Sequence, residues 1–230
     1  MDIQLQQKLT EYLAGFATQN RLDRFEEVLS QRTRYLTVVL ENIFQPHNAS
    51  AVLRTMECFG IQDVHIIEND YEYRVNPEIA LGAFQWLSLI RYNRLLDSGC
   101  DAVVNLRKKG YRIVAATPRP GAVSIKEFDL DKGPAAIFFG TELEGLSARI
   151  LEQADECIRI PIYGFTESFN VSVSAAIIIH HLAEKLRESE NIRWELSDEE
   201  KGLLRLEWLK RSVKHSDLII KRYVEESGGY

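Results

Sequence analysis

Long hydrophobic runs are absent from this 230-residue sequence, and no stretch approaches the ~20 apolar residues that a membrane-spanning helix needs. The first residues read MDIQLQQKLTEYL, which is polar and acidic, whereas a secretory signal peptide is first basic and then apolar. These two absences predict a cytoplasmic protein that has no membrane attachment.

Cysteine is scarce as well. The three cysteines, Cys58, Cys100 and Cys157, are isolated, with no C-x-x-C pair and no histidine at metal-ligand spacing. We therefore expect buried thiols and no metal site. Positive charge is not in excess either, because the net charge is −6. This charge argues against a protein coated with nucleic-acid-binding groups and leaves phosphate binding to local patches.

Regular alternation of strands and helices fills the middle of the chain. A buried strand is expected at residues 35–42, a helix at 48–58 that ends at Gly60, and a second strand at 63–67. Further expected elements are strands at 86–92, 111–117 and 135–139 and a helix from about Leu95 to Lys109. The pattern predicts an α/β fold, a mostly parallel sheet with helices on both faces.

The two ends of the chain have a different pattern. Leucine and phenylalanine recur at helical spacing within residues 3–30, which predicts two short amphipathic helices. After residue 188 a helical tail is expected, with Ser197 and Glu200 forming a capping box. We therefore divide the chain into an N-terminal helical extension (1–34), a central domain (35–188) and a C-terminal helical tail (189–230).

Three loops follow three of the expected strands, at residues 117–121, 140–145 and 160–169. In an open parallel sheet the carboxyl ends of the strands share one edge, so these loops should converge on a ligand crevice. Gly140 would let the backbone approach a ligand closely, and Gly145 would permit a positive φ angle. The glycine spacing matches neither G-x-G-x-x-G nor a Walker loop.

The third loop leads into an apolar helix. Ser168 or Asn170 can cap its first turn, and the apolar residues surround the helix axis so completely that we expect it to be buried. A capped core helix without any ligand would give the same pattern. Two residues earlier in the chain are similarly ambiguous when taken alone: Asn48 reads as a helix N-cap and Arg54 as a surface charge.

Taken together, three segments resemble the motifs of the SpoU/TrmH family of ribose 2′-O-methyltransferases, in the family's order. They are ENIFQPHNASAVLRTMECFGIQDVHII, IFFGTELEGLS and IPIYGFTESFNVSVSAAI. The resemblance covers residues 35–185. The short helical segments at both ends resemble the tRNA-specific branch, which modifies guanosine 18 in the D-loop.

The resemblance implies a SPOUT-type fold with a C-terminal trefoil knot, a homodimer, tRNA as partner and S-adenosylmethionine as methyl donor. At the positions where the family contacts the methyl donor, largely through backbone groups, this chain has Thr117, Gly140, Ile160 and Phe169. The family's third motif usually reads S-L-N, whereas this chain has phenylalanine in the middle position.

The family's catalytic positions carry Asn48, Arg54, Glu142, Ser168 and Asn170 in this chain. Arg54 is the family's usual candidate for the base, but a guanidinium keeps its proton far above neutral pH, so we interpret it mainly as a phosphate clamp. The two asparagines would orient Arg54 and the ribose. Glu142 would hold Arg54 or Asn48, and Ser168 would bind ribose or phosphate.

Substrate choice is not specified by the motifs. The same chemistry on ribosomal RNA or on another tRNA position is the first alternative, and a non-catalytic RNA-binding homologue is the second. Basic residues near the N-terminus and in the centre could form solvated faces or contact RNA phosphates. Those of the tail could belong to an amphipathic helix that packs at a dimer interface, or could contact tRNA. In chain order, the three groups are Arg21, Arg24, Arg32 and Arg34; Arg107, Lys108, Lys109, Arg112 and Arg119; and Lys201, Arg205, Lys210, Arg211, Lys214, Lys221 and Arg222.

Overall fold

A computed structural model describes residues 3–43, 45–68, 77–93 and 98–226. The chain forms two compact units, one of residues 33–194 and one of residues 1–32 together with 195–230. In the described ranges no helix has both the length and the apolar character needed to cross a membrane.

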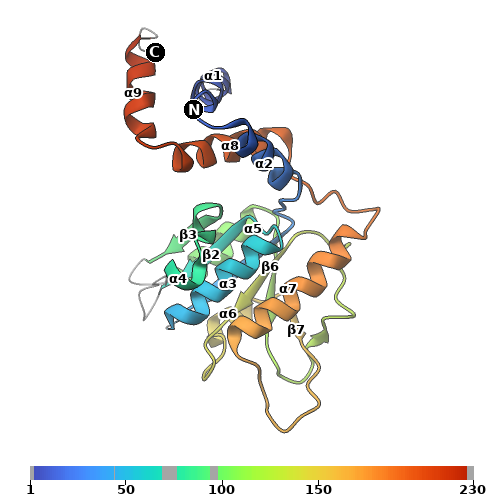
Figure 1. The fold of residues 1–230 in the computed structure, drawn as a ribbon. Coiled ribbons are helices and arrows are strands. Elements are labelled where there is room, and N and C mark those ends of the chain that lie inside the picture. The colour runs from blue at the N-terminus through green and yellow to red at the C-terminus, as the bar shows by residue number, and fades with distance from the viewer. Residues whose placement is uncertain (1–2, 44, 69–76, 94–97, 227–230) are drawn as a thin grey trace. The chain divides into compact units, whose positions relative to one another are not determined.

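The larger unit is built on a seven-stranded sheet with the order β3-β2-β1-β6-β4-β7-β5. Every strand pair in it is parallel, which confirms the predicted mostly parallel sheet (Figure 1). The strands are β1 Leu36–Glu41, β2 Asp63–Ile67, β3 Ser88–Tyr92, β4 Arg112–Ala116, β5 Val123–Ser124, β6 Ala135–Phe139 and β7 Glu156–Arg159.

Helices cover both faces of this sheet (Figure 1). Alternate side chains of a strand point to opposite faces, so Val38 and Leu40 of β1 join the core under α3 and α7, whereas Val39 joins the core under α5 and α6. The helices of this unit are α3 Pro46–Cys58, α4 Pro77–Ala80, α5 Ser98–Lys108, α6 Ala148–Gln153 and α7 Val171–Arg187, with a 3-10 turn, η1, at Ala83–Gln85.

Helix α3 begins earlier than predicted, and Asn48 is not its N-cap. Gln45 holds the N-cap position, without a side-chain cap hydrogen bond, and Pro46 occupies the first turn. A proline disfavours helical geometry in the residue before it and is itself suited to the first helical position. Asn48 therefore lies inside the first turn, buried with 4% of its surface exposed.

Two other expectations need correction, and a third cannot be compared. Helix α7 is not buried all round, since Val173 is 44% exposed. Cys58 is exposed, while Cys100 and Cys157 are partly buried. The predicted helix start near Leu95 lies outside the described residues, and the helix is described from Ser98.

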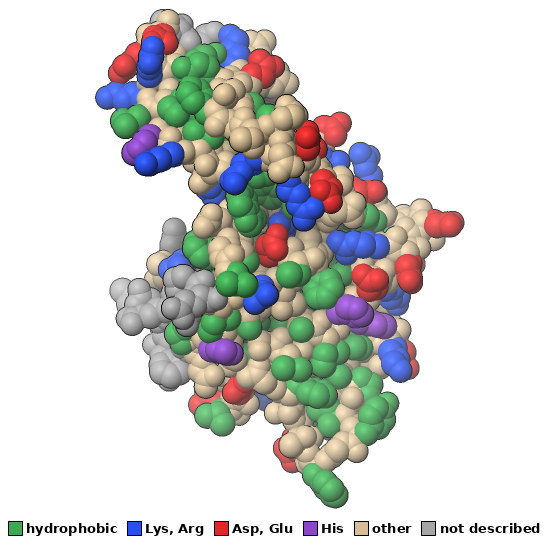
Figure 2. All heavy atoms as spheres, viewed as in Figure 1, with side chains coloured by type: hydrophobic (Ala, Val, Ile, Leu, Met, Phe, Trp, Pro, Cys, Tyr) green, Lys and Arg blue, Asp and Glu red, His purple; other side chains and the backbone are tan. Residues whose placement is uncertain are grey.

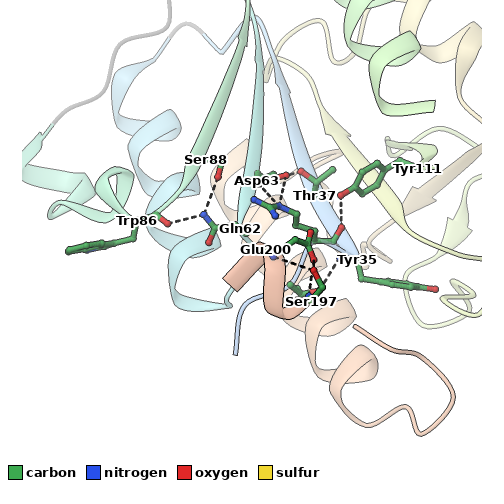
Figure 3. A network of polar contacts seen from close by, with 11 residues as sticks. Tyr35, Thr37, Gln62, Asp63, Trp86, Ser88, Tyr111, Ser197 and Glu200 are labelled. Atoms are coloured by element: carbon green, nitrogen blue, oxygen red, sulfur yellow. Dashed lines mark hydrogen bonds and ion pairs between the residues drawn. The ribbon is translucent and has the colours of Figure 1, made fainter. Parts of the chain in front are cut away.

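The amino ends of the strands are occupied by internal polar contacts (Figure 3). Gln62 Nε2 donates to the Trp86 carbonyl at 3.0 Å and to Ser88 Oγ at 3.2 Å, and Thr37 Oγ1 donates to the Asp63 carbonyl at 2.7 Å. These bonds join β1, β2 and the entry to β3. The end of the sheet opposite the three predicted loops therefore has a structural role.

The smaller unit contains α1 Ile3–Ala14, α2 Gln19–Ser30, α8 Asp198–Ser212 and α9 Ser216–Glu226. The two predicted N-terminal helices are thus confirmed, as is the capping box of Ser197 and Glu200 on α8. In its core, Trp208 packs edge-on against Phe25 at 5.5 Å between ring centroids, and the buried Arg32 guanidinium lies over the Trp208 ring at 5.4 Å.

Several basic residues of the tail are neutralised by carboxylates of the same unit. Arg205 pairs with Glu26 at 2.5 Å, and Arg222 pairs with Glu226 at 2.6 Å. Lys210 and Lys221 are also paired, with Glu207 and Glu225. These pairs favour the packing and solvated-face interpretation of the tail over a bare phosphate-binding surface.

Candidate active site

The three predicted loops meet at the carboxyl ends of the adjacent strands β6, β4 and β7, where they border a cavity of about 280 Å³. This arrangement confirms the expected crevice at one edge of the sheet. Each of the four residues placed by resemblance at donor-contact positions, Thr117, Gly140, Ile160 and Phe169, lines the cavity. Apolar side chains complete much of its wall, including those of Leu146, Leu151, Ile158, Val171 and Ile178.

The loop after β6 is closed on itself. Thr141 and Gly145 exchange two backbone hydrogen bonds, each 3.1 Å long, and the Glu144 amide donates to Thr141 Oγ1 at 3.1 Å. Gly145 has a φ angle of 73°, as its predicted role requires. This turn holds the acidic residues between the two glycines in a defined position.

Gly140 has a role that the sequence did not reveal. A Cβ atom at this position would lie 2.1 Å from the carbonyl carbon and oxygen of Gly145 and 2.3 Å from the Leu146 amide nitrogen. The backbone at Gly140 therefore approaches the loop's own chain closely, and its expected approach to a ligand stays a prediction. Any side chain here would force the turn open, because the atoms that it meets belong to the backbone.

The far end of the same loop is anchored to β1. The Glu41 carboxylate, 2% exposed, accepts from the Ser147 amide at 2.9 Å and from Ser147 Oγ at 2.7 Å. Ser147 in turn caps α6 by accepting from the Ile150 amide. A buried carboxylate at the end of one strand thus fixes the point where the loop becomes a helix.

Three of the five predicted catalytic residues form one hydrogen-bonded group, the Asn48–Glu142–Asn170 cluster. Asn48 Nδ2 donates to Glu142 Oε1 at 3.2 Å, and Asn170 Nδ2 donates to Asn48 Oδ1 at 3.1 Å and also to Glu142 Oε1. One oxygen of the carboxylate is therefore held by both amides. No described residue donates a hydrogen bond to the other oxygen, Oε2.

Each member of this cluster comes from a different element. Asn48 lies in the first turn of α3, Glu142 in the loop after β6, and Asn170 at the N-cap of α7. Asn170 uses its Oδ1 to accept from the Ser172 amide at 2.9 Å and from Ser172 Oγ at 2.6 Å. The predicted cap is confirmed for Asn170. Its amide oxygen caps α7, and its amide nitrogen donates to Asn48 and Glu142.

The other two predicted residues stand outside this cluster. Ser168 is exposed and lines the cavity two residues before Asn170. Arg54 is exposed on α3, six residues after Asn48. Six residues correspond to about 9 Å of helix rise and to a turn of roughly 120° away from the Asn48 face. Among the described residues Arg54 has no ion-pair partner, so Glu142 is bonded to Asn48 and not to Arg54.

Gln45 is a site residue that sequence reasoning missed. Its Oε1 accepts from Asn48 Nδ2 at 3.1 Å, so the residue extends the Asn48–Glu142–Asn170 cluster by one member. The available signal was the following proline, which favours a non-helical residue at the helix entrance. That signal locates the N-cap but says nothing about the side chain's partner.

Of the basic residues predicted in the centre of the chain, Arg107 and Arg112 lie at the amino ends of the strands, away from the cavity, and Arg119 lies beside the cavity. Arg107 pairs with Asp155 at 2.8 Å, and Arg112 pairs with Glu156 and donates to two backbone carbonyls, so these two are structural. Arg119 is exposed and lines the cavity. Within the described ranges no group of three or more His, Cys, Asp or Glu side chains could hold a metal ion.

Known proteins share this fold and these motifs. The model of the SpoU rRNA Methylase family matches residues 35–180. A tRNA (guanosine(18)-2′-O)-methyltransferase from Borreliella burgdorferi is 42% identical over 207 residues, covering 90% of this chain and 92% of that protein. The protein of the same name from Aquifex aeolicus is 32% identical over 88% of this chain and 93% of its own length.

The structural comparison agrees with the sequence comparison. The crystal structure of the A. aeolicus TrmH/SpoU tRNA modifying enzyme superimposes with a TM-score of 0.75 at 29% identity, covering 85% of this chain and 98% of that one. Together with the three motifs and the cavity that their loops form, these matches show that the chain belongs to the SpoU methylase family.

Proposed function

We propose that this protein transfers a methyl group from S-adenosylmethionine to the ribose 2′-hydroxyl of guanosine 18 in tRNA. The observation that carries the proposal is the Asn48–Glu142–Asn170 cluster beside the cavity of the three strand-end loops. Two relatives that match about nine tenths of the chain bear the name of this activity. Their match over this length favours tRNA over ribosomal RNA as the substrate.

The cavity suits the methyl donor chemically. Ile158, Ile160 and Ile178 offer an apolar surface for the adenine ring, and Glu142 and Glu167 offer carboxylates that complement a sulfonium and an ammonium group. Thr117, Gly140, Ile160 and Phe169 would hold the donor, largely through backbone groups. When bound, S-adenosylmethionine supplies an electrophilic methyl group.

Positioning is the main task left to the protein, because the ribose oxygen must be aligned and its proton removed. The two asparagine amides hold Oε1 of Glu142, which leaves Oε2 open to accept the hydrogen bond of the 2′-hydroxyl and then its proton as the new C–O bond forms. Ser168 would bind ribose or phosphate from the cavity wall. The exposed Arg54 would bind a substrate phosphate and stabilise the developing charge on the oxygen.

A homodimer is part of the proposal. The N-terminal half of α7 and the loop before it carry exposed apolar side chains, which gather on one face of the larger unit (Figure 2). They include Phe169 at 39% exposure and Val173 at 44%. A second copy of the chain would cover such a surface. The trefoil knot implied by the resemblance stays a prediction.

Transfer of labelled methyl groups from S-adenosylmethionine to unmodified tRNA transcripts tests the substrate assignment. We expect label on the ribose of guanosine 18 and its loss when that nucleotide is replaced. Label on another nucleotide, or on ribosomal RNA alone, would support the methyl-transfer activity but contradict guanosine 18 of tRNA as the substrate. Donor binding without transfer to any of these RNAs would instead favour a non-catalytic RNA-binding protein.

The role of Arg54 has its own test. Arg54→Ala should lower turnover by roughly a hundredfold or more, since an oxyanion stabiliser of this type has that magnitude. Donor affinity measured by calorimetry should stay at the wild-type value, because Arg54 does not line the donor cavity. A loss of only a few-fold would contradict the clamp role.

A further inference from the structure

A second cavity, of about 220 Å³, adjoins the first. Residues 141–144 of the loop after β6 line both cavities. Ile43, Gln45 and Asn48, at the entrance of α3, line the second cavity only. Glu142 lines both cavities. The Asn48–Glu142–Asn170 cluster thus stands between two hollows, only one of which the donor would fill.

Transfer of a methyl group explains why a second hollow is needed. The attacking oxygen approaches the methyl carbon from the side opposite the departing sulfur, so acceptor and donor must lie on opposite sides of the reacting carbon. Two adjoining cavities with Glu142 on their border can hold a donor and an acceptor next to each other. The second cavity is therefore placed to receive the target nucleoside, with the ribose near Glu142 and the base farther in.

The polar groups of the second cavity have a definite pattern. Gln45 Oε1 is occupied by Asn48, which orients the amide so that its Nε2 is left as a donor, and no described residue accepts from it. Glu144 is exposed and forms no ion pair with any described residue, while its backbone is fixed by the bond to Thr141 Oγ1. Besides Glu142, at the border with the donor cavity, the second cavity therefore offers Gln45 Nε2 as a donor and the Glu144 carboxylate as an acceptor.

This pair matches one purine and opposes the other. The Watson–Crick edge of guanine presents an acceptor, O6, beside two donors, N1–H and N2–H. Adenine presents a donor at the 6-position beside an acceptor at N1. Ile43, Leu143 and Val171 supply apolar surface for the faces of the ring.

We infer that the second cavity holds the target base and that Gln45 and Glu144 read it as guanine, through O6 and through N1–H and N2–H respectively. The inference rests on the proposed function and extends it to the choice of base. Both residues act on specificity, and neither takes part in the methyl transfer step.

The test compares wild type with Glu144→Gln on two tRNA transcripts, one with guanosine and one with adenosine at the target position. The measured quantity is the ratio of kcat/KM for the two RNAs at saturating S-adenosylmethionine. Glutamine can both donate and accept and so can pair with adenine. We expect the guanosine preference to fall by roughly tenfold or more in this variant, the size of one base contact.

A matched control is Glu152→Gln, which removes an exposed carboxylate of α6 that lines neither cavity. Its guanosine preference should equal that of wild type. Since each enzyme meets the same two RNAs, effects of the base change on RNA folding cancel. Weaker donor binding also cancels, because it lowers both rates alike.

An unchanged preference in Glu144→Gln would overturn the inference while leaving the proposed function intact. Failure of wild type to label guanosine 18 would instead refute the proposed function. Glu144→Ala provides a second variant that cannot pair with either base, and its preference should also fall. A wild-type preference in that variant would likewise overturn the inference.

Discussion

The loop after β6 and the loop after β7 border the same cavity, yet they are held in different ways. The first is closed by the Thr141–Gly145 backbone pair and anchored by Ser147 on Glu41. The second exposes large side chains, with Tyr163 92% exposed and Phe165 fully exposed. This loop is held at its end, where the Asn170 side chain caps α7.

This difference separates two tasks. The first loop carries Glu142 and holds it in place before any ligand arrives, which is the arrangement that electrostatic catalysis favours. The second loop presents apolar surface whose burial must come from outside the described unit, either from a ligand or from a second chain. The comparison predicts that substitutions in the first loop cost folding stability, whereas those in the second mainly cost association.

The largest loss of stability should come from Gly140→Ala. The new Cβ would meet Gly145 backbone atoms at 2.1 Å, so the closed loop must open, at a cost of about 3 kcal/mol or more. Urea unfolding measures the loss, and calorimetry should show that donor binding is abolished. Gly164→Ala in the second loop is the control, because its nearest atom is Thr166 Oγ1 at 4.0 Å. Equal unfolding free energies of the two variants would contradict the claim that the first loop contributes more to folding stability than the second.

Glu41→Gln should have the next largest effect. The neutral amide keeps the shape of the carboxylate but loses charge-assisted bonds to Ser147, which should lower the unfolding free energy by about 1–3 kcal/mol. Denaturant titration checks this value. Glu152→Gln, an exposed carboxylate in α6, should change stability by less than about 0.5 kcal/mol. If the two variants unfold alike, the anchor contributes nothing.

At Asn170 the structural and site roles can be separated. Asn170→Ala removes the cap of α7 and should cost about 1 kcal/mol, whereas Asn170→Ser restores a capping oxygen and should cost only a few tenths. Both variants lose the amide that bonds to Asn48 and Glu142, so methyl transfer should fall by roughly a hundredfold in each. Near-normal turnover in Asn170→Ser would show that the amide is needed only as a cap.

The smallest effect on folding should come from the double variant Tyr163→Ser, Phe165→Ser. Both rings are exposed, so the unfolding free energy should change by less than about 0.5 kcal/mol. If a second copy covers these rings, the dissociation constant of the dimer, measured by sedimentation, should rise roughly tenfold. Leu143→Ser alters a 98% exposed side chain of the first loop and should leave the dimer unchanged. An unaffected dimer in the double variant would remove these rings from the interface.

The sequence predicted the sheet, the helices on both faces and the convergence of three loops, because those features follow from apolar periodicity and from the geometry of parallel strands. It did not predict that Gly140 touches Gly145, because glycine spacing does not reveal which backbone approaches which. It also placed the N-cap of α3 at Asn48 when the proline two residues earlier moves the cap to Gln45.

The catalytic roles of the residues named by resemblance stay predictions, but the structure shows how three of them lie together. Resemblance named Asn48, Glu142 and Asn170, but only the structure shows that one carboxylate oxygen serves both amides. Contacts between residues as far apart as positions 48 and 170 depend on how α3 and α7 pack, which local patterns do not encode. The same reason explains why Gln45 was missed.

The strand order has a consequence for how the polypeptide is made. Strand β4 pairs only with β6 and β7 in the described sheet, and both follow it in the chain. While a ribosome is still adding residues before position 135, β4 has no neighbour to join, and β1 lacks its partner β6. Three edges of apolar strands, both of β4 and one of β1, must therefore stay unpaired until then, and the donor cavity can form only after the last strand has emerged.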